Sequence, residues 1–434
     1  MKSRALIGYL AIAGLLAGCG VFRGGEEGGG TTGGSAAPAA PGVTKEPCPM
    51  AVDKAKGCIY LGTISDLTQG PFAALAVPIT EAQKAFWARV NKAGGIGGKY
   101  EVDVQAYVRD NKYNPETHRQ VYNEIKDKVL GLAQTLGSPT TAAIIDDLKA
   151  SSIVSAPASW TSAWEFEDVI IETGSNYCVE SMNAVDYAME VYKPKSIMAV
   201  HLAGDYGADA AAGAKVAAEK NGVAFTAIET PPGATEQGRA ITEIVKNKPD
   251  VVIITTGPAD AAAVIGQAAA AGFKGRFIGT GPTWNPALLK SPAAPAIKAL
   301  YEQSSPGKPF GADTAGHKAM REALPGVSPN DGYTSGWAWS YPMKAALEKM
   351  VAGGDVSRKG LLAAVKSLAT VDYEGMLPPE AGNFAGDANA ATFRQTLINK
   401  VDEGAPTGVS IVKDFFTGPT AQGYTMDGPC FQKL

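Results

Sequence analysis

The feature that most constrains the fold of this 434-residue chain is a repeated alternation of short apolar segments with longer helical segments. Strands that are apolar along their whole length pack between two layers of helices, and helical connections between them produce a parallel sheet with right-handed crossovers. Two such series occur, so we predict an α/β chain with two doubly wound parallel-sheet lobes. The predicted strands are residues 59–65, 102–108, 129–136 and 153–157 in the first series and 196–202, 223–228, 251–256 and 276–280 in the second.

The last third of the chain is less regular. Residues 331–351 and 358–367 have helical character, whereas short strands at 392–401 and 409–416 alternate with Gly and Pro turns. We interpret this region as antiparallel additions or as a return of the chain to the second lobe.

The N-terminus has the pattern of an export signal. A short basic region precedes an apolar stretch at 5–17, which is too short to span a bilayer. The sequence Leu-Ala-Gly-Cys at 16–19 resembles the lipobox of bacterial lipoproteins, in which the peptide is cut before the cysteine and the cysteine sulfur is diacylated. We expect a lipoprotein signal peptide at 1–18 and lipidation of Cys19, with an ordinary signal peptide and an incidental cysteine as the alternative.

Residues 19–47 form a candidate tether between a membrane and the folded body. Gly, Ser, Thr, Pro and Ala dominate this stretch, which cannot bury enough apolar surface to fold. A flexible chain of this length reaches roughly 30 Å, and a diacylglycerol supplies the two acyl chains that stable anchoring needs. We expect a protein that is lipid-anchored on the extracytoplasmic face of the cell membrane.

Four further cysteines allow three disulfide pairings. An even number of cysteines in an exported chain indicates two disulfides. We favour Cys48–Cys58 as a local link and Cys178–Cys430 as a long-range link, with free buried thiols as the alternative.

The composition argues against several functions. A net charge of −4, with 39 Lys and Arg residues scattered along the chain, does not indicate a nucleic-acid partner. The three histidines, His118, His201 and His317, have no metal-ligand spacing. The glycine-rich run at 94–99 differs from a phosphate-binding loop, because Tyr100 follows its lysine and because it lies between a helix and a strand. We expect a chain without a metal, a cofactor or enzymatic activity.

Loops that follow the predicted strands are candidates for a binding site. Small molecules bind beyond the carboxyl ends of parallel strands, where loops meet helix N-termini. Helix capping explains any single loop, but the recurrence of such loops at equivalent strand ends in both halves predicts a cleft between two lobes. Aromatic side chains that are candidates for its lining are Phe72, Trp160, Trp164, Trp284, Tyr333 and Trp337, of which Phe72 and Trp160 lie on the predicted cleft loops.

Several short motifs resemble one known family. They are Ala-Gly-Gly-Ile-Gly-Gly-Lys at 93–99, Val-Arg-Asp-Asn at 108–111, Ala-Gly-Asp-Tyr-Gly at 203–207 and Lys-Pro-Asp-Val-Val at 248–252. Together they resemble the type I periplasmic binding proteins of the branched-chain amino acid (Leu/Ile/Val-binding) family. The resemblance extends over about residues 58–366 and fades in the tail.

The resemblance implies two lobes that are joined by a hinge of three crossing segments and that close on a ligand. We expect the crossings near Thr173, near Gly281 and within 370–390. The expected division of the folded body is 48–173 in lobe I, 174–281 in lobe II, 282–375 again in lobe I, and 376–434 as the lobe II return with a C-terminal extension.

The resemblance also implies roles for individual residues. In relatives, the loops that match 138–140 and 158–161 hold the ligand carboxylate through N–H and hydroxyl groups, and the tyrosine that matches Tyr206 closes over it from the second lobe. The ligand-binding residues that we predict are Phe72, Ser138, Thr140, Ser159, Trp160, Thr161, Tyr206, Gly281 and Tyr333.

One position departs from the family pattern. Amino-acid binders hold the ligand ammonium with an acidic residue that aligns here with Gly281. Because a buried ammonium without a carboxylate partner costs free energy, an α-amino acid ligand requires Asp205, Asp260 or Asp331 as a substitute.

The family implies an extracytoplasmic solute-binding protein of an ABC importer. We expect a monomer that captures a small polar ligand, namely a branched-chain or other amino acid, a small carboxylate or an amide, and that delivers it to permease and ATPase subunits. A lipoprotein that senses the ligand and reports to a membrane signalling receptor, and a structural surface lipoprotein with an empty cleft, are the alternatives.

Overall fold

The computed structural model describes residues 40–434. The predicted signal peptide, the lipidation site Cys19 and most of the predicted tether lie outside the described residues. No helix among residues 40–434 combines the length and hydrophobicity that crossing a bilayer requires.

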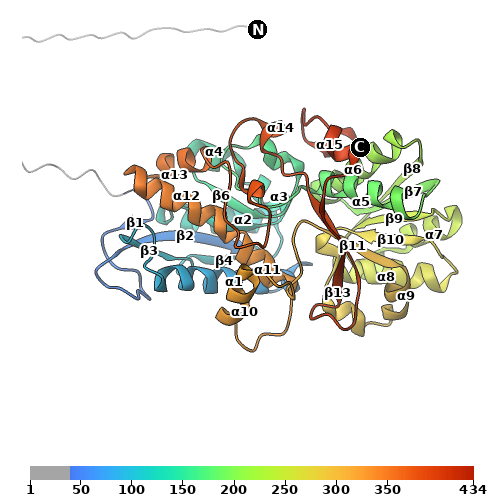
Figure 1. Ribbon diagram of the computed structural model, residues 1–434, viewed down its shortest axis with the longest axis horizontal. Helices are drawn as coiled ribbons and strands as arrows, with labels where there is room; N and C mark the ends of the chain where they lie inside the picture. Colours follow the sequence, from blue (N-terminus) through green and yellow to red (C-terminus); the bar gives the residue numbers. More distant parts are fainter. Residues whose placement is uncertain (1–39) are drawn as a thin grey trace, which may run out of the picture. The chain divides into compact units, whose positions relative to one another are not determined.

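Lobe I contains a sheet of six strands, in which β2 and β5 are central (Figure 1). The β2–β5 and β5–β6 pairs are parallel, whereas the short β1 is antiparallel to β2. β5 is buried along its whole length, as expected for a central parallel strand, although Gln134 and Thr135 within it are polar. The strands are β1 (Val43–Thr44), β2 (Gly57–Ser65), β3 (Tyr100–Asp103), β4 (Val108–Asp110), β5 (Gly131–Leu136) and β6 (Ser155–Ala158).

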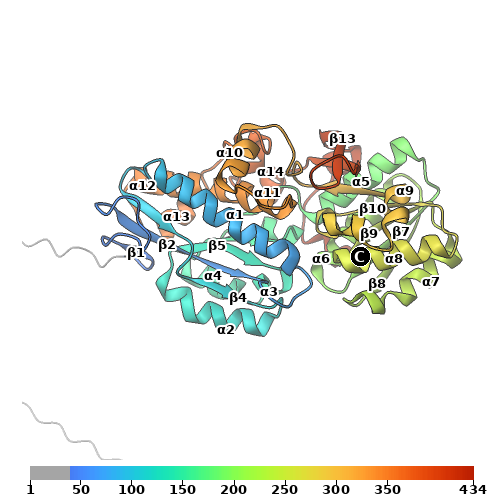
Figure 2. The same cartoon turned by 90° about the horizontal axis from the view of Figure 1, so that it is seen from below.

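Helices cover both faces of this sheet, with α1 and α2 on opposite sides (Figure 2). Ile79, Ala82, Phe86 and Val90 form the buried stripe of α1, at the three- and four-residue spacing of an amphipathic helix. The lobe I helices are α1 (Ala73–Lys92), α2 (Pro115–Ile125), η1 (Lys126–Lys128), α3 (Ser138–Ala142), α4 (Ile145–Ser151), η2 (Ser162–Phe166), α10 (Ala315–Ala323), α11 (Asp331–Ala338), α12 (Ser340–Gly353), α13 (Arg358–Val365), η6 (Pro379–Gly382) and α14 (Ala388–Ala391).

Lobe II contains a seven-stranded sheet of order β13-β12-β11-β10-β9-β7-β8. The five strands from β7 to β11 are parallel, and β12 and β13 add an antiparallel edge. The strands are β7 (Ser196–Leu202), β8 (Ala224–Thr230), β9 (Val251–Thr255), β10 (Arg276–Gly279), β11 (Tyr301–Ser305), β12 (Thr396–Val401) and β13 (Val409–Phe416). The helices are α5 (Tyr177–Val191), α6 (Asp205–Lys220), η3 (Ala234–Glu236), α7 (Gly238–Asn247), α8 (Pro258–Ala270), η4 (Gly281–Thr283), η5 (Pro286–Lys290), α9 (Ala294–Leu300), α15 (Pro419–Gly423) and η7 (Cys430–Lys433).

The two-lobed α/β fold that the sequence predicts is confirmed, with local differences. The predicted strand 102–108 is divided into β3 and β4, which pair with different parts of β2. The predicted helix 331–351 is interrupted at Trp339, between α11 and α12. β11 was not predicted, because its sequence Tyr-Glu-Gln-Ser-Ser lacks the apolar run of a buried strand.

The chain crosses between the lobes three times. The crossings follow Ile171, Ser305 and Phe393, where the chain leaves one sheet and its helices and enters the other. Our expectation of a crossing near Gly281 was wrong, because β10 and β11 pair in parallel in the same lobe II sheet and the chain stays there through Ser305. The segment after residue 375 likewise stays in lobe I longer than expected, since Met376, Leu377 and Phe393 are buried in the lobe I core.

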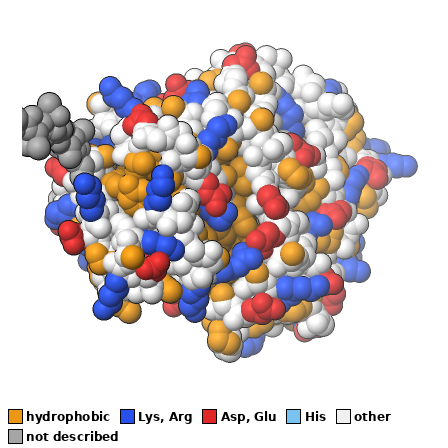
Figure 3. Space-filling model, turned by 60° about the vertical axis from the view of Figure 1, so that its left-hand side comes forward, with side chains coloured by type: hydrophobic (Ala, Val, Ile, Leu, Met, Phe, Trp, Pro, Cys, Tyr) orange, Lys and Arg blue, Asp and Glu red, His pale blue; other side chains and the backbone are white. Residues whose placement is uncertain are grey.

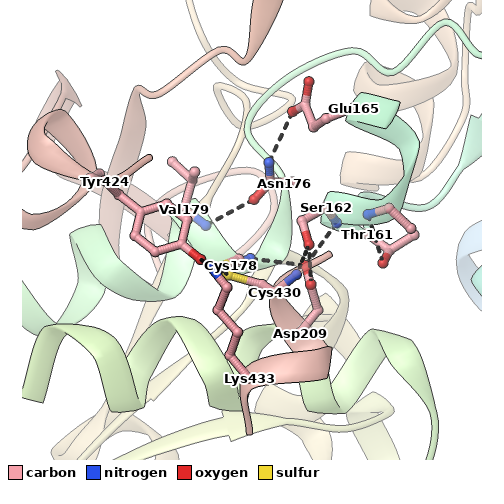
Figure 4. Close-up of a disulfide and its surroundings, with 12 residues drawn as sticks. Thr161, Ser162, Glu165, Asn176, Cys178, Val179, Asp209, Tyr424, Cys430 and Lys433 are labelled. Carbon is pink, nitrogen blue, oxygen red and sulfur yellow. Dashed lines mark hydrogen bonds between the residues drawn. A yellow bond between two sulfur atoms is a disulfide. The ribbon is translucent and has the colours of Figure 1, made fainter. Parts of the chain in front are cut away.

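Two disulfides, Cys48–Cys58 and Cys178–Cys430, are present, with the pairings that the sequence favours. Cys178 lies on α5, and α6 packs closely against it because Gly213 has no side chain: a Cβ there would lie 2.1 Å from the Cys178 carbonyl oxygen. Ser162 Oγ accepts a hydrogen bond from the Cys430 N–H at 2.7 Å (Figure 4). The second disulfide therefore attaches the C-terminus to lobe II beside a lobe I loop.

We predict that the two disulfides contribute unequally to stability. In the loop-closure description, a link over 252 residues contributes about 5 kcal/mol and a link over 10 residues about 3 kcal/mol, as upper values. The double variant Cys178→Ala/Cys430→Ala is expected to lose more unfolding free energy in denaturant titrations than Cys48→Ala/Cys58→Ala. Equal losses would contradict this description.

Candidate ligand-binding cleft

A cavity of about 1100 Å³, including the part open to solvent, lies between the lobes. Lobe I contributes the loops after β5 and β6 and the ends of α1 and α11 that face the second lobe. Lobe II contributes the first turns of α5 and α6, the segment after β10, and residues of β11 and β12. The carboxyl ends of parallel strands from both sheets thus meet at one site, as expected for open α/β sheets.

Aromatic rings form a continuous wall from one lobe to the other. Trp160 of lobe I lies 5.9 Å from Tyr177 of lobe II, and Phe72 lies 6.0 Å from Tyr206, between ring centroids. Such edge-to-face contacts are favourable beyond the apolar area that they bury. The further ring pairs in this wall are Trp160–Trp339 at 4.9 Å, Phe72–Tyr113 at 4.9 Å and Tyr177–Tyr206 at 4.6 Å.

Internal hydrogen bonds hold three of the polar groups in this wall. The Trp160 indole donates to the Thr173 carbonyl at 2.7 Å, and Ser159 Oγ accepts from the Trp164 indole at 3.0 Å. The Tyr206 hydroxyl lies 3.2 Å from Thr280 Oγ1. Because these groups are already satisfied, they fix the shape of the cleft more than they offer free polar contacts.

A few buried polar atoms of the lining have no partner among residues 40–434. Ser138 Oγ, Thr334 Oγ1 and Asn399 Oδ1 belong to this group, and Ser138 is only 1% exposed. A buried polar atom without a hydrogen bond costs about 1–3 kcal/mol. The two hydroxyl groups can donate to a ligand oxygen, whereas Asn399 Oδ1 can only accept a hydrogen bond, from a bound water or a ligand donor.

Two charged side chains of the lining are already engaged. Asp331 Oδ1 accepts a hydrogen bond from the Phe310 N–H at 2.7 Å, and burial raises the pKa of Asp331 to about 6. Lys308 Nζ pairs with Asp414 Oδ2 at 3.0 Å. Three acids are candidate partners for the ammonium group of an amino acid ligand. Asp331 lines the cleft, whereas Asp205 and Asp260 do not.

Gly281 lines the cleft with backbone only. Its N–H donates to Glu180 Oε1 at 2.9 Å, and Ser304 Oγ donates to the same oxygen at 2.7 Å. Burial raises the pKa of Glu180 to about 8. Glu180 supports the cleft floor from behind and does not belong to the lining.

Six of the nine predicted ligand-binding residues meet at the cleft, and three do not. Thr140 is fully buried and its Oγ1 donates to the Gly137 carbonyl at 2.9 Å. Thr161 caps η2, and the Tyr333 hydroxyl donates to Glu81 at 3.2 Å outside the cleft. The six residues of the lining are Phe72, Ser138, Ser159, Trp160, Tyr206 and Gly281, and Trp284 from the wider aromatic set also lines it, whereas Trp164 and Trp337 do not.

Sequence reasoning missed several lining residues. Tyr177 begins α5 and Trp339 lies between α11 and α12, within segments whose apolar pattern indicates only core packing. Gln303 and Asn399 come from β11 and β12, which become cleft walls only because the antiparallel edge adds to the lobe II sheet. Tyr113 could have been predicted as a lining residue, because it follows the predicted strand 102–108 by a few positions and lies two positions after the Val-Arg-Asp-Asn motif.

The family model described as periplasmic binding protein matches residues 59–404. The chain belongs to this family. The match covers most of the folded body and confirms the resemblance to type I periplasmic binding proteins, an extracytoplasmic family. None of the curated proteins matches the chain.

Solved structures with this fold include proteins that differ in ligand. The fatty acid ABC transporter substrate-binding protein from Thermomonospora curvata is similar at 29% identity, with a TM-score of 0.81, over 90% of this chain and 97% of that one. A branched-chain amino acid ABC transporter from Thermus thermophilus with bound valine shares the fold at 16% identity, with a TM-score of 0.71, over 85% and 98%. A leucine-binding protein from Thermotoga maritima does so at 15%, with a TM-score of 0.68, over 83% and 99%.

Proposed function

We propose that this protein is the solute-binding subunit of an ABC importer and that its ligand is a monocarboxylate with an extended apolar body, of the fatty acid type. The observation that carries the proposal is the cleft wall, in which aromatic and aliphatic side chains dominate and few polar atoms remain free. Apolar ligand surface gains most from such a wall, at about 25 cal/mol per Å² removed from water.

The charges of the lining favour a carboxylate over an α-amino acid. Gly281 has no side chain with which to hold an ammonium group, and the carboxylate of Asp331 is used by the Phe310 N–H. Ser138 Oγ is a free donor for a ligand oxygen. The likeness to the Thermomonospora curvata protein, which binds a fatty acid according to its description, supports the same ligand class.

Ligand capture follows from the two-lobed arrangement. A ligand that contacts Trp160 and Phe72 of lobe I together with Tyr177 and Tyr206 of lobe II stabilises the closed form relative to the open form. The closed form then docks on the permease. This role requires binding without chemical change of the ligand, so the protein is not an enzyme.

The location of the protein is part of the proposal. Cleavage before Cys19 and diacylation of its sulfur place a monomeric body on the extracytoplasmic face of the membrane. The tether keeps its local concentration near the permease high. The charged side chains of both signs that are interspersed on the face in Figure 3 are typical of such a soluble body rather than of a nucleic-acid-binding surface.

The proposed ligand class is tested by a chain-length series. Octanoate, dodecanoate and hexadecanoate are expected to bind with rising affinity, by about fourfold for each added CH₂ that the wall removes from water. Calorimetry on delipidated protein measures this, and mass spectrometry of the co-purified solute identifies the natural ligand. Saturable binding of leucine with no binding of any fatty acid would refute the ligand class while leaving the importer role intact.

Substitutions of three lining residues test the proposed contacts with the ligand. Ser138→Ala and Tyr206→Ala are expected to weaken dodecanoate binding by about tenfold, the cost of about 1.4 kcal/mol for a lost contact. The unfolding temperature is expected to stay unchanged in Ser138→Ala but to fall in Tyr206→Ala, because the Tyr206 ring is buried against Phe72 and Tyr177. Asp331→Asn is expected to preserve or strengthen binding, because it removes a negative charge that faces the ligand carboxylate. A strong loss with Asp331→Asn would instead indicate that the ligand carries an ammonium group.

Anchoring is tested at the predicted lipidation site. The full-length precursor is expected to partition into the membrane fraction, and Cys19→Ser is expected to abolish acylation and to release the folded body or leave it as unprocessed precursor. Fractionation with metabolic labelling by a fatty acid probe measures both effects. An unlabelled wild-type protein would leave the binding role intact and disprove the anchor.

A further inference from the structure

A second cavity, of about 860 Å³ including the part open to solvent, lies beside the hinge and is separate from the ligand cleft. Its lining includes η2 and the segment that follows it, the ends of η6 and α14, and the first and third crossings between the lobes. In the first crossing, Glu172 and Gly174 line this second cavity, whereas Thr173 between them lines the ligand cleft. The proposed import function does not use this cavity.

Two acidic side chains of this lining form the carboxyl pair Glu165 and Glu172. Glu172 is only 9% exposed, and no side chain or N–H group of the described residues donates a hydrogen bond to its carboxylate oxygens; the carboxyl group of Glu165 is its hydrogen-bonding neighbour. Glu165 Oε1 accepts a hydrogen bond from Asn176 Nδ2 at 2.9 Å (Figure 4). A buried carboxylate without a cationic partner costs several kcal/mol, so this pair requires either a proton or a cation.

The carboxyl pair has one cation nearby, which acts on Glu165. The charge of Arg394 opposes the rise that burial causes in the pKa of Glu165, and its guanidinium also donates to the Ala421 carbonyl at 2.8 Å. On α6, Asp209 adds a further acidic group that faces Glu172, and its carboxylate is held by the Ser162 N–H at 2.9 Å. Burial and these acidic neighbours raise the pKa of Glu172 well above its usual range.

The rim of the second cavity is acidic as well, and its charges are engaged. Lys366 pairs with Asp168, and Glu167 pairs with Lys149 at 2.9 Å. Asp387 caps α14 through the N–H groups of Asn389 and Ala390. The lining therefore holds five acidic side chains and one lysine, namely Glu165, Glu167, Asp168, Glu172, Asp387 and Lys366.

We propose that the second cavity is a binding site for an organic cation, a primary ammonium group on an apolar stem, which pairs with Glu172 and Glu165. The aromatic side chains of the lining, Trp164, Phe166, Phe384 and Phe393, suit the apolar stem and attract a cation through their ring faces. A metal ion fits less well, because residues 40–434 contain no cluster of three or more His, Cys, Asp or Glu side chains with metal-binding geometry.

Proton release distinguishes binding of a cation at the buried carboxyl pair from binding at the acidic rim of the cavity. Burial and the acidic neighbours raise the pKa of Glu172 and so favour its protonated form, whereas binding of an ammonium group favours the ionised carboxylate. Each bound cation therefore displaces up to about one proton, and the affinity for the cation rises with pH. At the rim, by contrast, Asp168 and Glu167 are already paired with lysines and Asp387 caps α14, so proton release is expected only from the buried carboxyl pair.

Calorimetry with 1,4-diaminobutane on the intact mature protein tests the proposal. Saturable binding is expected at pH 7, with an enthalpy that differs between phosphate and MOPS buffers because protons are released. Butan-1-ol, which has a four-carbon apolar stem but no charge, and CaCl₂ in MOPS are the matched comparisons, and neither is expected to bind. The affinity for 1,4-diaminobutane is expected to fall by at least about tenfold in Glu172→Gln and Glu165→Gln, which lose a buried charge partner.

The control variant is Glu116→Gln on α2, which removes an exposed acid that pairs with Arg119 away from the cavity and should leave binding unchanged. Four outcomes would each overturn the proposal. They are the absence of saturable heat, equal affinity for the diamine in Glu172→Gln, binding of Ca²⁺ without binding of the diamine, and binding of the diamine without proton release. If Glu172→Gln fails to fold, the buffer comparison on the wild-type protein still decides.

Discussion

Burial of parallel strands on both faces is the constraint on which the rest of this structure depends. Strands such as β5 and β9 are buried along their length, so each sheet needs helices on both sides and short loops at the strand ends. All the loops at the carboxyl ends then project from one edge of the sheet. Because the chain crosses between two such sheets, these edges face each other, and the cleft is a consequence of the topology before any individual side chain is considered.

The cleft lining has few polar side-chain groups that are free to bind a ligand. Gly281 contributes no side chain to the lining, and hydrogen bonds within the protein already occupy polar groups of Trp160, Ser159 and Tyr206. What remains is an apolar surface with a few free oxygen atoms such as Ser138 Oγ. A ligand with one small polar end and a long apolar body matches this distribution better than a zwitterion does.

The first crossing between the lobes borders two different cavities within three residues. Thr173 faces the apolar ligand cleft, whereas Glu172 and Gly174 line an acidic cavity on the other side of the same segment. Any group that binds Glu172 therefore contacts a segment that joins the two lobes. The Ser162–Asp209 contact and the disulfide at Cys178 lie close to the same crossing.

The sequence by itself determined the two-lobed α/β fold, because local periodicity encodes strands and helices of this kind. It also located Ser138, Ser159 and Gly281, because residues at the carboxyl ends of strands reach the cleft in a doubly wound sheet. It did not determine β11, whose polar sequence gives no strand signal, nor the crossing after Ser305, which depends on that strand joining the lobe II sheet. Tertiary structure alone placed Tyr177, Trp339 and Asn399 in the cleft and brought Glu165 to Glu172. Contacts of this kind join distant elements and depend on how the elements pack, which no local pattern records.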